Sequence, residues 1–254
     1  MTTEQLEAYY KRICYFPQGG PSAENLRNIH KNQALHIPFE NMDVYRGKGI
    51  SLDPEDLFNK IVVRRRGGYC FELNGLMADA LISGGYKVKR VVARLDGKGM
   101  GFGGHLHCGA IVDVDGSRYI CDVGYGAGGF TEPLKLELGT VQKVLGGTYR
   151  VVSDPDHGYV IQLLKDGEFK GYMAIRDQAA LKQDFEIGNY YTSTNPNSGF
   201  RRFVMCTIPT EEGRISIADN YVKIVSGGSE ETIPLNGMDE VYAALKKYLH
   251  LELD

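Results

Sequence analysis

No stretch of the sequence approaches the roughly 18 apolar residues that a membrane-spanning helix needs. The first residues, MTTEQLEAYYKRICYF, carry charges where a secretory signal peptide would have its apolar segment. The five cysteines are odd in number, widely spaced and never arranged as C-x-x-C, which favours reduced thiols over a disulfide framework or a zinc ribbon. We therefore expect a cytoplasmic protein with no membrane partner.

An excess of positive charge is also missing. Lys and Arg number 29 against 32 for Asp and Glu, so the formal net charge is -3 and the pI lies near 6.1. Because nucleic-acid-binding domains usually carry a basic surface, nucleic acids are not expected as partners. Internal repeats and low-complexity linkers are absent too, and a chain of 254 residues can bury a core without a disulfide or a metal ion.

The first 85 residues have the apolar spacing of helices. A capping-box pattern at Thr2 and Gln5 begins the first helix. Further helices are expected to start at Ser22, at Asp53-Pro54 and close to Cys70, the last one ending at Gly84-Gly85.

From Tyr86 the apolar residues alternate with period two, which indicates strands. The segments are KVKRVVARL, HLHCGAIVDV, SRYICDV, TYRVVSD and YVIQLLK, with hairpin turns at Asp115-Gly116 and Asp166-Gly167. This pattern predicts an antiparallel sheet or barrel. After about residue 185 the pattern is mixed, with strands near 203–208, 214–218 and 221–225 and a final helix striped by Met238, Val241, Leu245 and Leu249.

Cys70 lies between a double glycine and a helix, in the segment RRRGGYCFELNG. The positive end of a helix macrodipole stabilises a thiolate, so we expect the pKa of Cys70 to fall below the free value of about 8.5. This position makes Cys70 a candidate nucleophile. The alternative is a small buried core residue, because most free cysteines are of that kind.

A histidine and an aspartate come together if Asp115-Gly116 is a two-residue turn. Position 114 then pairs with 117, and His107 and Asp122 become diagonal neighbours on one face, roughly 7 to 8 Å apart between their backbones. His105 shares that face but lies farther from Asp122, so the register favours His107. A three-residue loop would separate the pair, and a satisfied buried histidine beside a strand-end aspartate is the structural alternative.

Together, the three residue types suit nucleophilic catalysis. An imidazole can take the thiol proton, and a carboxylate can fix the tautomer of that imidazole and support the imidazolium. Backbone N–H groups at the helix start can stabilise a tetrahedral oxyanion. This combination predicts acyl transfer through a thioester.

Several segments resemble the arylamine N-acetyltransferase family. They are IPFEN at 37–41, LFNKIVVRRRGGYCFELNG at 57–75, His107 at the start of a strand, DVGYG at 122–126 and YYTSTNPNSGFRRF at 190–203. The resemblance covers most of the chain in order. It implies an α+β fold with an N-terminal helical domain (1–85) that carries the nucleophile, a central antiparallel β-barrel (86–185) that carries the His and Asp, and a C-terminal α/β lid (186–254).

The reaction implied by the resemblance is ping-pong and uses no metal. Acetyl-CoA acylates Cys70, CoA leaves, and an arylamine, hydrazine or arylhydroxylamine takes the acetyl group. The implied triad is Cys70, His107 and Asp122; the implied substrate contacts are Phe39, Tyr69, Phe71 and Tyr125, and Gly124 and Gly126 are implied to lie against CoA. The family usually has phenylalanine in place of Tyr125, and the glycine-rich segment GKGMGFGGHLHC also departs from its pattern.

Other interpretations of single motifs are weaker. GYGAGG at 124–129 satisfies a dinucleotide fingerprint, but Thr131, Glu132 and Pro133 follow where that site needs a helix. Arg64, Arg65 and Arg66 are most simply cations at the negative end of a helix, with phosphate binding as the alternative.

A different class of function, a zinc-binding module without turnover, would use His105, His107 and Asp122. Cys108 and Cys121 would point to the other face of the hairpin and could not join them. Among enzymes, the alternatives are an amide synthase on the same scaffold and a protease or transglutaminase with the same triad. A thioester on Cys70 would separate the enzymes from the zinc module.

Overall fold

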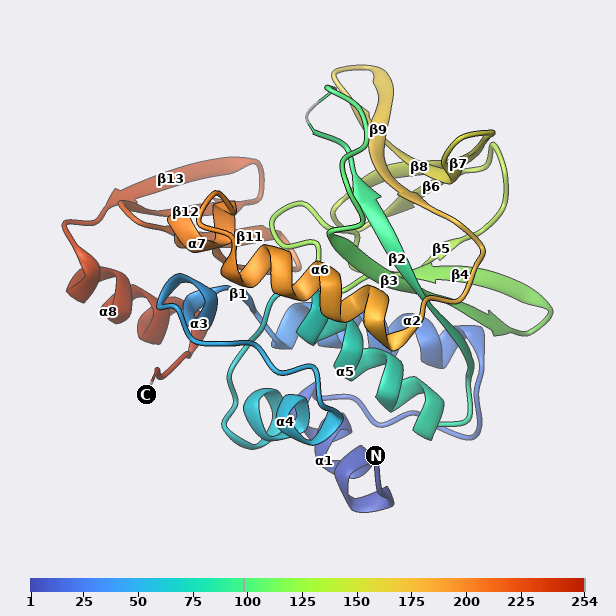
Figure 1. Ribbon diagram of the computed structural model, residues 1–254, viewed down its shortest axis with the longest axis horizontal. Helices are drawn as coiled ribbons and strands as arrows, with labels where there is room; N and C mark the ends of the chain where they lie inside the picture. The colour runs from blue at the N-terminus through green and yellow to red at the C-terminus, as the bar shows by residue number, and fades with distance from the viewer. Residues whose placement is uncertain (98, 254) are drawn as a thin grey trace.

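The computed structural model describes residues 1–97 and 99–253, so Lys98 of the glycine-rich segment lies outside the described residues. Figure 1 shows the N-terminal helices below a strongly curved sheet, with a second sheet and the C-terminal helix at the opposite end. Over the described ranges of the chain, no helix is long and apolar enough to cross a membrane. The mixture of helices and antiparallel sheets confirms the α+β class.

Three of the predicted helices begin where their capping residues predict. The Gln5 N–H donates to Thr2 Oγ1 at 3.2 Å, and the Thr2 N–H donates to Gln5 Oε1 at 2.9 Å, which completes the capping box. Ser22 and Asp53 cap the next two predicted helices with their side chains. In chain order, the helices are α1 (Thr3–Arg12), α2 (Ala23–His36), α3 (Met42–Tyr45), α4 (Pro54–Phe58), the π-helical η1 (Asn59–Val63), α5 (Cys70–Ser83), α6 (Lys182–Thr194), α7 (Gly199–Arg202) and α8 (Met238–Leu249).

Within the described residues, eight strands form one curved antiparallel sheet in the order β5-β4-β3-β2-β9-β8-β7-β6. The Gln142 side chain on β6 bonds both the N–H and the carbonyl of Lys135 on β5, so the two edges approach each other and the sheet is nearly a closed barrel. The strands are β2 (Lys87–Leu95), β3 (His107–Val114), β4 (Ser117–Cys121), β5 (Leu134–Lys135), β6 (Val141–Val144), β7 (Gly147–Asp154), β8 (Gly158–Lys165) and β9 (Glu168–Ile175).

The hairpin between β3 and β4 has the predicted two-residue turn. Asp115 and Gly116 have φ values of 50° and 68°, as a type I′ turn requires. Val114 pairs with Ser117, and Ala110 pairs with Cys121. The register deduced from the sequence is therefore confirmed, and Cys121 faces away from the side that carries His107.

A second sheet has the order β1-β10-β11-β12-β13 in the described chain. Its strands are β1 (Phe39–Glu40), β10 (Cys206–Thr210), β11 (Gly213–Ala218), β12 (Tyr221–Ser226) and β13 (Ser229–Pro234). Val241 and Leu245 of α8 pack on the sheet in a separate apolar core. Because β1 comes from the first 85 residues, that region is not purely helical, and it is joined to the C-terminal region by strand pairing.

Helix α5 is the central element of the fold. Figure 1 shows it beneath α6 and next to β2 and β3 of the barrel. Its residues from Cys70 to Ala78 are all buried, and it contacts α1, α4, β2 and β3. The first turn of α5 thus lies inside the protein, and this burial controls the chemistry of Cys70.

Candidate active site

The start of α5 is fixed by a buried carboxylate. Glu72 Oε2 accepts a hydrogen bond from the Tyr69 N–H at 3.0 Å, which caps the helix one residue before Cys70. Lys60 of η1 donates to Glu72 Oε1 at 2.7 Å and also lies 2.8 Å from Asp43. The buried ion pair with Lys60 therefore fixes Glu72, the carboxylate that caps the start of α5.

Arg66 is buried in an ion pair and is not the exposed helix-end cation that the sequence predicts. It is 3% exposed and donates through Nη2 to Glu40 Oε1 at 2.7 Å. The same nitrogen lies 3.3 Å from Asp43. Its partners come from the IPFEN region, so Arg66 ties the segment before Cys70 to β1 and is not available for a phosphate.

His107 and Asp122 form a buried pair at the open end of the β3–β4 hairpin. His107 opens β3, Asp122 follows β4, and His107 Nε2 lies 2.7 Å from Asp122 Oδ2. The side chains are 2% and 0% exposed. Burial alone would raise the pKa of Asp122, but the His107 charge and the hydrogen bonds from His107, Asn74 and the Gly124 N–H hold that pKa below its usual value.

Asn74 joins helix α5 to this pair. Its amide nitrogen donates to Asp122 Oδ1 at 2.8 Å and to the Cys108 carbonyl at 2.9 Å, and its oxygen accepts from the Val123 N–H at 2.9 Å. Asn74 was not among the residues predicted from the sequence. The signal was its position four residues after Cys70, which places both side chains on one face of α5.

Cys70 and His107 line one pocket of about 400 Å³ at the junction of α5, the barrel and α6. Phe39, Tyr125 and Phe200 form aromatic walls of this pocket. The Tyr125 ring stacks on Tyr172 at 4.2 Å between centroids and presents an edge contact to His107 at 6.0 Å. A second pocket, of about 360 Å³, shares Phe39, Tyr125 and Phe200 and extends toward β11.

Two of the implied substrate contacts do not line this pocket. Tyr69 is fully buried, and its hydroxyl bonds Asn189 and Thr192 of α6. Phe71 is 1% exposed and packs so closely on α6 that a Cβ at Gly188 would lie 2.6 Å from its ring. Both rings pack α6 against the start of α5, and their assignment as substrate contacts stays a prediction.

Gly124 has a steric reason to be glycine. A Cβ at this position would lie 2.6 Å from the Cys70 Cα and 2.8 Å from Asn74 Nδ2. Gly126 has a φ of 86° and faces the Phe39 ring. Both glycines therefore allow the segment after Asp122 to pass close to Cys70 and to Phe39 in the pocket wall.

His105 lies apart from this group. It is exposed and lines a different pocket, together with Arg94, His157 and Arg176. Among the residues that the structure describes, no group of three or more His, Cys, Asp or Glu side chains could hold a metal ion. The zinc-module alternative thus has no ligand set in the described chain.

The expectation that the pKa of Cys70 falls below its free value is wrong. Burial raises the pKa of the Cys70 thiol well above its usual value, and the neighbouring Cys108 and Asp122 raise it further, while the Phe71 N–H at the helix start lowers it. The helix terminus therefore does not ionise this thiol by itself. Formation of the thiolate requires a base close to Cys70.

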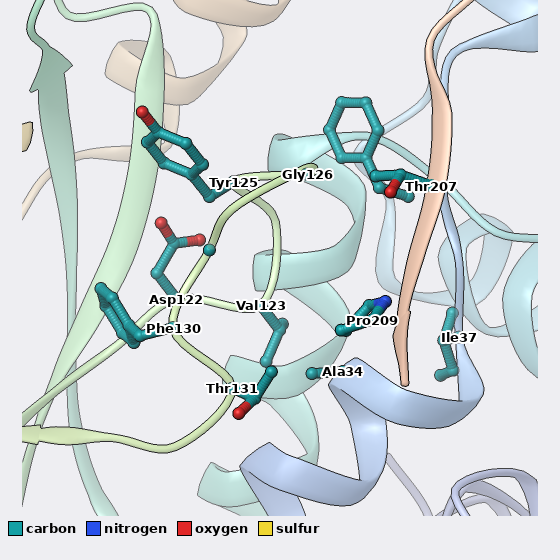
Figure 2. A pocket seen from close by; sticks show the side chains of 12 residues that line it. Ala34, Ile37, Asp122, Val123, Tyr125, Gly126, Phe130, Thr131, Thr207 and Pro209 are labelled. Atoms are coloured by element: carbon teal, nitrogen blue, oxygen red, sulfur yellow. The ribbon is translucent and has the colours of Figure 1, made fainter. Parts of the chain in front are cut away.

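Figure 2 shows the side of the Asp122–Thr131 segment that is turned toward α2 and β10. Val123 and Thr131 of this segment lie next to Ala34 of α2. Ile37, which follows α2, and Thr207 and Pro209 of β10 complete a small cavity of about 20 Å³. The segment is thus supported from behind by α2 and β10.

Comparison with known proteins gives consistent matches. The sequence model of a family described as N-acetyltransferase matches residues 22–254. An arylamine N-acetyltransferase of Mycobacterium tuberculosis is 33% identical over 91% of this chain and 83% of its own length. The structure of arylamine N-acetyltransferase from Salmonella typhimurium superposes with a TM-score of 0.93 at 28% identity, covering 99% of this chain and 92% of that one. The Mycobacterium marinum enzyme in complex with CoA has a TM-score of 0.88 at 30% identity, covering 96% and 92%.

Proposed function

This chain belongs to the arylamine N-acetyltransferase family and is an acyltransferase that uses acetyl-CoA, and on that basis we propose that Cys70, His107 and Asp122 perform the transfer. The observation that carries the proposal is that Cys70 and His107 line one pocket while His107 Nε2 is held 2.7 Å from Asp122. The nucleophile comes from the N-terminal region, 1–85, and its two partners come from the barrel region, 86–185. The C-terminal region, 186–254, supplies the remaining wall of the pocket.

In the first half-reaction, His107 takes the proton of the Cys70 thiol. Because Asp122 occupies Nε2, the nitrogen that acts as base is Nδ1. The Cys70 thiolate attacks the acetyl carbonyl of acetyl-CoA, the carbon–sulfur bond to CoA breaks, and the leaving thiolate takes the proton from the imidazolium. The products are free CoA and an acetyl thioester on Cys70.

In the second half-reaction, the amine attacks the thioester and His107 accepts the proton that the amine loses. The carbon–sulfur bond to Cys70 breaks, and the cysteine thiolate receives that proton back. Asp122 keeps its charge throughout and stabilises the imidazolium in both halves. Its lowered pKa agrees with this role.

The acceptor is a small aromatic amine, hydrazine or arylhydroxylamine. The pocket volume of about 400 Å³ lies within the range of roughly 300 to 1,000 Å³ of small-molecule sites. Phe39, Tyr125 and Phe200 offer ring faces to an aromatic acceptor. The Tyr125 hydroxyl adds a polar group to this wall. Gly124 and Gly126 let the backbone approach the pantetheine arm of CoA.

We place the enzyme in the cytoplasm. All five cysteines of the sequence are free thiols in the structure, and this state suits a reducing compartment.

Intact-protein mass spectrometry after incubation with acetyl-CoA tests the function directly. We expect a gain of one acetyl group per chain, carried by the peptide that contains Cys70 and lost when an arylamine is added. A chain that takes up no acetyl group, or takes it up on another residue, would contradict the proposal. A chain that accepts only larger acyl groups would favour an amide synthase.

Replacing His107 with Gln is expected to stop acetylation of Cys70 and to slow its alkylation by iodoacetamide near neutral pH. Without the base, burial together with Cys108 and Asp122 keeps the thiol pKa raised, so alkylation should accelerate only at alkaline pH. Rates are measured by mass spectrometry of the labelled Cys70 peptide across a pH series.

The matched control is His105→Gln, because His105 is exposed and lines a different pocket. This variant should keep nearly the wild-type rates. A larger loss from His105→Gln than from His107→Gln would assign the base to His105.

A further inference from the structure

The segment from Asp122 to Thr131 carries much of the pocket wall, and one imidazole holds both of its ends. His30 lies on α2 and is fully buried. The Asp122 N–H donates to His30 Nε2 at 3.1 Å, and His30 Nδ1 lies 2.9 Å from the Thr131 carbonyl oxygen. His30 is not one of the triad residues, and its ring spans the base of the loop that they share.

The partners of His30 determine its protonation state. A carbonyl oxygen only accepts hydrogen bonds, so Nδ1 must carry the proton that it donates to Thr131. A backbone N–H only donates, so Nε2 must be unprotonated to accept from Asp122. The ring is therefore the neutral Nδ1–H tautomer, and a second proton on Nε2 would place two donors against each other.

The surroundings of the ring agree with this state. His30 stacks on Phe130 at 5.9 Å with an interplanar angle of 13°, which fixes the ring plane from one side. Burial lowers the pKa of His30 to about 4, although the Thr131 carbonyl and the charges of Asp122 and Glu132 act to raise it. The neutral form thus predominates across the physiological range.

The loop needs such a support because it is rich in glycine. Four of its ten residues are glycines, and Gly126 and Gly128 have positive φ values. As Figure 2 shows, α2 places the side chain of Ala34 next to this loop, and this apolar side chain cannot form a hydrogen bond with the loop. His30, one turn earlier on the same helix, supplies directed hydrogen bonds.

We propose that His30 is a positioning residue for acetyl transfer, because its Nε2 fixes the backbone of Asp122 and so sets the direction of the carboxylate that holds His107. The proposal rests on the function proposed above. Acetylation of Cys70 in the wild-type protein tests that function, whereas the effect of His30 substitutions on the acetylation rate tests this role.

Two substitutions at His30 separate its two hydrogen bonds. In His30→Gln the amide oxygen reaches about the place of Nε2 and can still accept from the Asp122 N–H. In His30→Asn the shorter amide reaches only the place of Nδ1, so it can bond Thr131 but not Asp122. His36→Asn is the matched control, since His36 lies on the same helix and its Nδ1 contacts only its own helix, at the Asn32 carbonyl.

The acetylation rate at saturating acetyl-CoA is measured by rapid quench for each variant, together with the acetyl-CoA concentration for half-saturation and a melting curve. We expect His30→Asn to lower the saturating rate by about 10- to 100-fold, because small displacements of reacting groups have effects of this size. The half-saturation concentration should stay unchanged. His30→Gln should recover most of the rate, and His36→Asn should match the wild type.

Equal rates for His30→Asn and the wild type would overturn the proposal, and so would equal losses for His30→Asn and His30→Gln. If neither His30 variant folds, nitrogen NMR of the wild-type histidines decides: an unprotonated Nε2 and a protonated Nδ1 at His30 near pH 6 support the proposal. A doubly protonated ring, or a proton on Nε2, contradicts it.

Discussion

Cys70→Ala is expected to take up no acetyl group from acetyl-CoA and to produce no acetylated amine. The proposed reaction passes through a covalent thioester, and a methyl side chain can form none. Product is measured by chromatography of the arylamine mixture, and the acyl-enzyme by intact mass. The melting temperature should stay close to the wild-type value, because the substitution removes a single buried sulfur atom.

Cys108→Ala is the matched control for this variant. Cys108 is also fully buried, and its thiol donates to the Cys70 carbonyl at 3.5 Å, so it lies beside Cys70 without entering the pocket. We expect Cys108→Ala to retain acetylation. A Cys70→Ala protein that acetylates an arylamine at the wild-type rate would remove Cys70 from the mechanism, and loss of acetylation in Cys108→Ala alone would move the nucleophile to Cys108.

Asp122→Asn is expected to lower the acetylation rate by roughly 10⁴-fold, the effect of the comparable change in a serine protease. Asp122 Oδ1 accepts from both Asn74 and the Gly124 N–H, so an asparagine keeps its oxygen there and turns its NH₂ toward His107. His107 Nε2 must then accept, and the ring proton moves to Nδ1. In this tautomer Nδ1 cannot take the proton of Cys70.

Loss of folding is the competing outcome, because breaking a buried charged pair can cost about 3 to 5 kcal/mol. A melting curve beside the rate measurement separates the two effects. Asp122→Asn that melts and acetylates like the wild type would show that Asp122 has no catalytic role.

The pH dependence of stability adds a check on the same residue. Since the pKa of Asp122 is lowered in the folded protein, its ionisation stabilises the fold above the unfolded pKa of about 3.9. This stabilisation is lost as the pH falls through the lower folded value. The stability difference between wild type and Asp122→Asn should therefore shrink in acid.

Local signals in the sequence were enough to predict the starts of α1, α2, α4 and α5 and the β3–β4 hairpin. The Asp115-Gly116 turn fixes the register within a few residues, and that register brings His107 and Asp122 together. Helix α6 has no such signal. Leu181 stands at the cap position of α6, and Ile187 is 69% exposed. The helix packs on Phe71 through Gly188, so its apolar residues do not form a helical stripe.

The missed components of the site depend on contacts between distant residues. His30 is 92 positions before Asp122, and no local pattern links the two. The two-residue strand β1 is too short for a periodic signal, although IPFEN contains it. The position of Cys70 at a helix start was predicted, but its raised pKa follows from burial by elements that fold around it.

Asn74 ties the helix of Cys70 to residues that are synthesised later than the helix itself. During synthesis, Cys70 leaves the ribosome well before His107 and Asp122, and the contacts of Asn74 with Asp122, Val123 and Cys108 can form only once the hairpin exists. Until then the nascent chain carries an ordinary thiol without a base. In a chain whose hairpin has not formed, Cys70 therefore lacks the base that the proposed acyl transfer needs.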